Sequence, residues 1–114
     1  MGETGSREWA VTAEKLEEAV RRLVRIASPV RIILFGSHAR GDADDFSDLD
    51  LLIVEREVEN RYEELQRLSE ALLGLVLPVD LLVISEADYR EWSQTPGSVY
   101  RAADLEGKVL YEAA

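Results

Sequence analysis

Hydrophobic and polar positions divide the chain into alternating helical and extended segments. Between residues 12 and 27, apolar side chains recur at helical spacing with charged residues between them, which predicts an amphipathic helix. A second helix is predicted from Asn60, since Asn60 and Glu63 resemble a capping box. Three short apolar runs bounded by turn residues predict strands, and these runs cover residues 30–35, 49–54 and 77–84.

The end of the chain continues this alternation. Ser85 is expected to start a further helix because Glu86 and Asp88 fall in its first turn. Another helical segment is predicted over 96–104, and a terminal strand over 107–111. The order of elements indicates one compact layered α/β domain. We expect that domain to span residues 11–114, after a loose lead-in over residues 1–10.

Composition narrows the range of functions. Of the 114 residues, 23 are acidic and 13 are Lys or Arg, which gives a formal net charge of −10. This balance argues against direct nucleic-acid binding and suits a metal–nucleotide site or a basic protein partner. The chain has no Cys, so it has neither disulfides nor a thiolate metal site, as is usual in the cytoplasm. No apolar run is long enough for a membrane span.

Two carboxylates stand at the head of the second predicted strand, in the segment Ser47-Asp48-Leu49-Asp50. Asp is depleted in strands, and side chains two apart on a strand share a face, so the two charges repel. A divalent cation removes that repulsion. Asp80 adds a third carboxylate inside the next apolar run. If the two strands are neighbours, Asp48, Asp50 and Asp80 form an oxygen-only site suited to Mg²⁺. Two such ions, about 3.5–4 Å apart, could assist a displacement at phosphorus.

A glycine-serine turn precedes these carboxylates. Gly36 ends the first apolar run and leaves room for a phosphate to approach the backbone. Ser37 offers a hydroxyl, the turn after it exposes backbone N–H groups, and Arg40 could reach the same phosphates. The sequence therefore predicts a phosphate site beside the metal site.

Together these motifs resemble the minimal nucleotidyltransferase (MNT) family of the polymerase-β-like superfamily. Gly36-Ser37 is followed, after ten intervening residues, by Asp48-Leu49-Asp50, and Asp80 stands where that family has its third carboxylate. The resemblance extends over most of the chain, from Val11 to Glu112.

The resemblance implies a fold, an activity and a partner. The fold would be the α+β nucleotidyltransferase fold, a small mixed sheet flanked by helices. The activity would be MgATP binding and transfer of AMP, with Asp48, Asp50 and Asp80 holding the metal and Asp80 helping to deprotonate the acceptor. Gly36, Ser37 and Arg40 would hold the nucleotide. The partner would be a HEPN-domain RNase toxin, whose tyrosine hydroxyl accepts AMP. The chain would then be a cytoplasmic antitoxin, with a hetero-oligomer possible.

Each candidate site residue could also have a purely structural role in place of a functional one. Asp48 and Asp50 could be charges tolerated at an exposed strand edge, and Asp80 could face water at the start of its strand. Ser37 could be only a helix N-cap. Arg40 could pair with the acidic residues 42, 44 or 45.

Two other functions remain open from the sequence. The chain could neutralise a basic toxin simply by masking its surface, without catalysis. It could instead transfer a nucleotide to a small hydroxylated molecule such as an aminoglycoside, with a partner subunit supplying the acceptor pocket.

Overall fold

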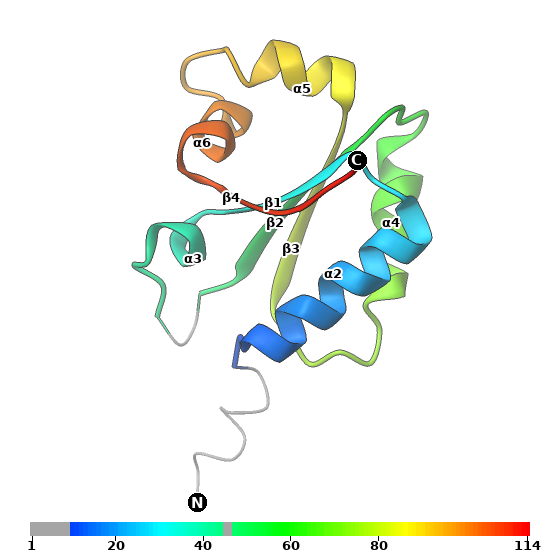
Figure 1. The fold of residues 1–114 in the computed structure, drawn as a ribbon, viewed down its shortest axis with the longest axis vertical. Helices are drawn as coiled ribbons and strands as arrows, with labels where there is room; N and C mark the ends of the chain where they lie inside the picture. The colour runs from blue at the N-terminus through cyan, green and yellow to red at the C-terminus, as the bar shows by residue number, and fades with distance from the viewer. Residues whose placement is uncertain (1–9, 45–46) are drawn as a thin grey trace, which may run out of the picture.

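A computed structural model describes residues 10–44 and 47–114, so most of the predicted lead-in over residues 1–10 lies outside the described residues. The described chain forms a four-stranded sheet with helices on both faces (Figure 1). The helices are α2 (Ala13–Ala27), α3 (Ser37–Arg40), α4 (Arg61–Ala71), α5 (Glu86–Trp92) and α6 (Val99–Glu106). The strands are β1 (Arg31–Phe35), β2 (Leu49–Glu55), β3 (Val79–Ser85) and β4 (Lys108–Glu112).

The sheet is mixed, in the order β3-β2-β1-β4. β1 is antiparallel to both β2 and β4, whereas β2 and β3 are parallel. Parallel neighbours need a crossover connection, and α4 supplies it here. The predicted α+β class, with a small mixed sheet flanked by helices, is confirmed.

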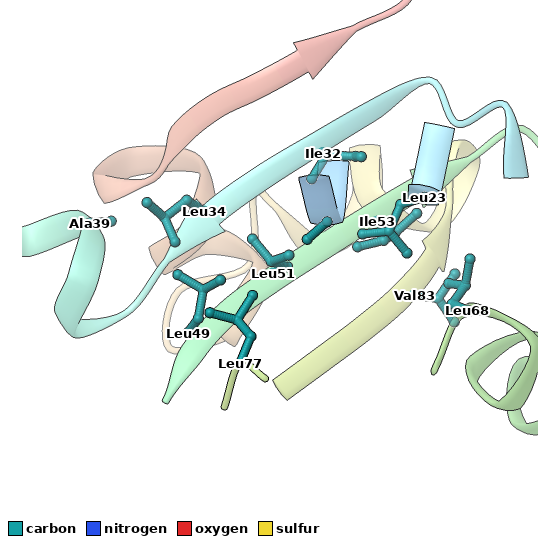
Figure 2. Packing of buried hydrophobic residues seen from close by; sticks show 11 residues of the cluster. Leu23, Ile32, Leu34, Ala39, Leu49, Leu51, Ile53, Leu68, Leu77 and Val83 are labelled. Carbon is teal, nitrogen blue, oxygen red and sulfur yellow. The ribbon is translucent and has the colours of Figure 1, made fainter. Parts of the chain in front are cut away.

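The core has two layers, one on each face of the sheet. Leu51 and Ile53 face α2 and α4, while Leu52 and Val54, the alternate residues of β2, face α5 and α6. Figure 2 shows the first layer, in which side chains from β1, β2, α2 and α4 meet. Residues 51–54 of β2 are all apolar and all buried, on both faces of the sheet, as predicted for a central strand.

Local capping confirms several predicted boundaries. The side chains of Thr12, Asn60 and Ser85 each accept a hydrogen bond from the backbone N–H three residues later, at the starts of α2, α4 and α5. Two elements have boundaries other than those predicted. The helical segment predicted over 96–104 is α6, which runs from Val99 to Glu106 after the N-cap Ser98. β3 begins at Val79 and not at residue 77. Pro78 has no N–H for the ladder, and its carbonyl instead accepts a 2.8 Å hydrogen bond from the Leu49 N–H. That bond lies where β2 begins beside β3.

Leu51→Ala is expected to cost about 2–5 kcal/mol of unfolding free energy, because Leu51 is fully buried and its loss leaves a cavity between the sheet and α2 (Figure 2). Urea unfolding followed by circular dichroism measures the change. Leu105→Ala is the matched control, since Leu105 is mostly exposed on α6 and should cost far less. Equal destabilisation by the two variants would contradict this description of the core.

Candidate active site

The parallel pairing of β2 and β3 places Asp50 and Asp80 at directly opposed positions. Directly opposed residues of neighbouring strands point to the same side of a sheet. Both carboxylates therefore lie on the face that carries Leu52 and Leu82, the face that α5 and α6 cover farther along. Asp48 is exposed and immediately precedes β2, so it approaches from the loop and not from the strand itself.

The electrostatics of Asp50 show the influence of the two neighbouring acidic residues on it. Partial burial raises the pKa of the Asp50 carboxyl above its ordinary value, and the negative charges of Asp80 and Asp48 raise it further. His38 and Arg40 act in the opposite direction, with smaller effect. The site thus holds more negative charge than its own cations balance.

Gly36 packs directly against the Asp50 carboxylate. A Cβ atom added to Gly36 would overlap that carboxylate, and the backbone of Gly36 has φ 74° and ψ −155°, a conformation that essentially only glycine adopts. β1 and β2 set this contact, because Phe35 at the end of β1 pairs with Asp50. The glycine between β1 and α3 is therefore required by the close approach of two chain segments.

Ser37 is the first residue of α3, and Gly36 is the N-cap. The structural interpretation of Ser37 as an N-cap is thus wrong, since the capping position is one residue earlier. The carbonyl of Ser37 accepts hydrogen bonds from the N–H groups of Gly41 and Asp42, at 2.9 and 3.1 Å, which close the short turn.

Arg40 is engaged in ion pairs on the protein surface. Its guanidinium lies 3.2 Å from the carboxylate of Asp42 and 3.8 Å from that of Glu106. The pairing with Asp42 was an alternative open from the sequence, whereas Glu106 could not be inferred because it lies far away in the chain. Nearby, the Nε2 of His38 is 3.1 Å from the carbonyl oxygen of Ser47, which ties α3 to the loop before β2.

The donor chemistry of this site suits a hard cation. The acidic side chains offer only carboxylate oxygens, which Mg²⁺ prefers. After burial, the negative charges of Asp80 and Asp48 are the main causes that raise the pKa of Asp50, and a bound cation would offset that repulsion. Within residues 10–44 and 47–114, however, no three His, Cys, Asp or Glu side chains are already arranged to hold a metal ion. The carboxylates therefore fit the ion in chemistry, with side-chain adjustment needed to bind it.

A family model for the nucleotidyltransferase domain matches residues 13–103, which is most of the chain. The protein belongs to the nucleotidyltransferase domain family.

One curated relative is a candidate protein adenylyltransferase from Methanocaldococcus jannaschii. The two sequences are 42% identical over 53 residues, a stretch that makes up 46% of this chain and 52% of that protein. The match thus spans about half the length of the relative.

Three solved structures share the fold. A candidate nucleotidyltransferase from Sulfolobus solfataricus aligns with a TM-score of 0.54 at 23% identity, covering 90% of each chain. A chain of a toxin–antitoxin structure with AMP-PNP aligns at 0.61 and 21% identity, covering 85% of this chain and 73% of that one. A chain from the tri-AMPylated Shewanella oneidensis HEPN toxin in complex with MNT antitoxin aligns at 0.52 and 18% identity, covering 87% and 73%.

These comparisons confirm the nucleotidyltransferase domain and the fold predicted from the sequence. The assignment to the minimal nucleotidyltransferase family within it stays a prediction. The roles of Asp48, Asp50, Asp80, Gly36 and the other site residues stay predictions. Among the described residues, no helix has the length and apolar character that a membrane crossing requires.

Proposed function

We propose that this protein is a Mg²⁺-dependent nucleotidyltransferase that moves AMP from ATP to a hydroxyl group of a protein partner. The observation that carries the proposal is the pairing of Asp50 with Asp80 beside the backbone of Gly36. Membership of the nucleotidyltransferase domain family and the name of the archaeal relative support it. The toxin–antitoxin structures support a HEPN toxin as the acceptor, with this chain as its antitoxin. The absence of Cys from the sequence suits a cytoplasmic location.

Each site residue has a role in this proposal. Asp48, Asp50 and Asp80 would hold Mg²⁺, which when bound neutralises phosphate charge and stabilises the negative charge of the displacement at phosphorus. Gly36 leaves its backbone open to the β- and γ-phosphates, and the Ser37 hydroxyl donates a hydrogen bond to them. Arg40 would exchange its surface carboxylate partners for a phosphate oxygen.

The transfer is a displacement of pyrophosphate at the α-phosphorus of ATP. The oxygen of the acceptor hydroxyl forms a bond to the α-phosphorus of ATP, and the bond from that phosphorus to the oxygen bridging to the β-phosphate breaks. Pyrophosphate leaves with the electron pair of the broken bond. The proton of the acceptor hydroxyl passes to the carboxylate of Asp80, which acts as general base.

Label transfer tests the proposal. The protein, Mg²⁺, α-labelled ATP and the product of the neighbouring gene are mixed and separated on a denaturing gel. We expect a labelled partner band with the wild type and no such band with the Asp48→Asn/Asp50→Asn variant. Transfer by the double variant at the wild-type rate would contradict the assignment of the site. Label on a small molecule in place of protein would move the acceptor to that class.

The net charge of −10 favours a second candidate, a binding antitoxin that masks a basic toxin. In that case the Asp48→Asn/Asp50→Asn variant would still neutralise the toxin, but only in stoichiometric amounts. A catalytic antitoxin acts at substoichiometric amounts and requires ATP. Titrating toxin activity against both forms, with and without ATP, separates the two functions.

A further inference from the structure

Glu55 is an unusual residue for its position. It is the last residue of β2, at the opposite end of that strand from Asp50, and only 8% of its surface is exposed. Its Oε2 atom is buried and has no hydrogen-bond partner, the one such side-chain atom among the described residues. A buried carboxylate oxygen without a hydrogen-bond partner destabilises the folded state, so its presence requires a physical explanation.

Glu55 lines a cleft of about 470 Å³ beside the N-terminal half of α4. The other lining residues come from the loop between β2 and α4 and from α4 itself. They are Glu57, Val58, Glu59, Asn60, Glu63, Glu64 and Arg67. The cleft thus gathers five glutamate side chains and one arginine, a strong excess of negative charge. In Figure 1 the loop that follows β2 leads to the start of α4, at the end of the sheet away from α3.

Arg67, the single arginine of the cleft, already donates hydrogen bonds to other groups. Its Nε and Nη2 atoms donate to the two carboxylate oxygens of Glu64, at 2.9 and 2.8 Å, in a bidentate pair. Its Nη1 atom donates to the carbonyl oxygen of Ile26 at 2.6 Å. Arg67 therefore satisfies Glu64 and leaves Glu55 without a cation of its own.

The environment of Glu55 favours its neutral form. Burial raises the pKa of the Glu55 carboxyl to about 8. A hydrogen bond that the protonated Glu55 carboxyl donates to the Glu64 carboxylate and the negative charge of Glu64 raise it further, while Arg67 has a small opposite effect. A positively charged ligand placed against this carboxyl would favour its ionised form and release a proton.

We propose that this cleft is a binding site for an arginine side chain on a basic segment of a partner protein. A guanidinium presents several donors in a plane, and it would satisfy the unpaired Oε2 of Glu55 once that side chain turns toward the cleft, because Oε2 is now buried. The neighbouring Glu57, Glu59 and Glu63 extend the negative surface, which suits a segment with more than one positive charge.

This inference is independent of the proposed transferase activity. Glu55 and Asp50 lie at opposite ends of β2, so a ligand in the cleft does not occupy the candidate active site. Loss of one function is therefore not expected to remove the other.

Calorimetric titration with a capped Gly-Arg-Arg-Gly peptide tests the inference. We expect the wild type to bind this peptide about tenfold more tightly at pH 9 than at pH 6.5, since the ligand favours ionised Glu55. The same peptide with citrulline in place of arginine should not bind. Glu55→Gln should weaken binding at pH 9 and remove the pH dependence. Glu91→Gln, which removes an exposed carboxylate on α5, should behave as the wild type.

Three results would overturn the proposal. One is equal binding of the arginine peptide by Glu55→Gln and the wild type. Another is equal binding of the arginine and citrulline peptides. The third is binding of spermidine or Mg²⁺ with the same dependence on Glu55 and with higher affinity, which would reassign the cleft to a small cation.

Unfolding measurements keep the Glu55→Gln result interpretable. The folded pKa of Glu55, about 8, lies above its ordinary value of 4.5, so the folded state holds an extra proton between those values. Wild-type stability should accordingly fall as pH rises from about 4.5 to about 8. Glu55→Gln should show a smaller decline over that range and stay folded at pH 9. A decline as steep in the variant would mean that another group titrates.

Discussion

Replacement of Asp50 by Asn is expected to lower the rate of AMP transfer about a thousandfold or more without lowering stability. A loss of this size corresponds to about 4 kcal/mol of transition-state stabilisation, which is the scale of a metal-binding contribution. Asn has nearly the same shape, so the packing against Gly36 is kept while the charge is removed. Burial of the Asp50 carboxylate and its repulsion by Asp80 and Asp48 disfavour its charge. Removal of that charge should therefore not destabilise the folded state.

Single-turnover transfer of label from ATP measures the rate, and thermal unfolding measures the stability. Asp88→Asn is the matched control, since Asp88 is an exposed carboxylate in the first turn of α5 and should leave the transfer rate unchanged. If Asp50→Asn retained a tenth or more of the wild-type rate, Asp50 would not be a metal ligand. A fall in melting temperature would instead show that the carboxylate stabilises the fold.

The local sequence predicted the helices and strands well, because the apolar pattern and the capping residues of each element lie within the element or directly beside it. Thr12, Asn60 and Ser85 are capping residues whose side chains bond within three positions, so the sequence contains the whole interaction. The apolar run of β2 likewise indicates burial on both faces before any partner is known. Such features are decided by neighbours in the chain.

The arrangement of the site depended on a condition that local sequence cannot settle. Asp50 and Asp80 come together only because β2 and β3 are adjacent and parallel, with α4 as the crossover between them. The sequence could state this only as a condition on the two strands being neighbours. The resemblance to a known family implied that Asp80 belongs with Asp48 and Asp50. The register of the sheet now gives the position of Asp80 relative to Asp50.

Other contacts had no signal in the sequence at all. Arg40 pairs with Glu106, and Arg67 donates to the carbonyl of Ile26, across separations at which any acidic or carbonyl partner was equally plausible. Glu55 did carry a faint signal, since it is a charged residue that directly continues an apolar strand. Its burial follows from α4 packing over the end of β2, which is a tertiary effect.

Gly36→Ala is expected to damage both stability and transfer. The backbone conformation alone costs a non-glycine residue about 1–3 kcal/mol, and the added Cβ overlaps the Asp50 carboxylate besides. Either the backbone shifts or Asp50 moves away, and both displace a group of the candidate site. Urea unfolding should show the loss of stability, and the label-transfer rate should fall at least as far as for Asp50→Asn.

Gly97→Ala separates the two causes. Gly97 also has a positive φ, 85°, but nothing lies within 4 Å of an added Cβ, so this variant pays for backbone strain alone and should retain transfer. Adding Asp50→Ala to Gly36→Ala removes the overlapping carboxylate and should recover part of the stability but none of the activity. If the two substitutions lowered stability additively, the contact between Gly36 and Asp50 would not be the source of the effect. A less-than-additive loss would instead show that Gly36 is glycine because the Asp50 carboxylate occupies the space of a side chain.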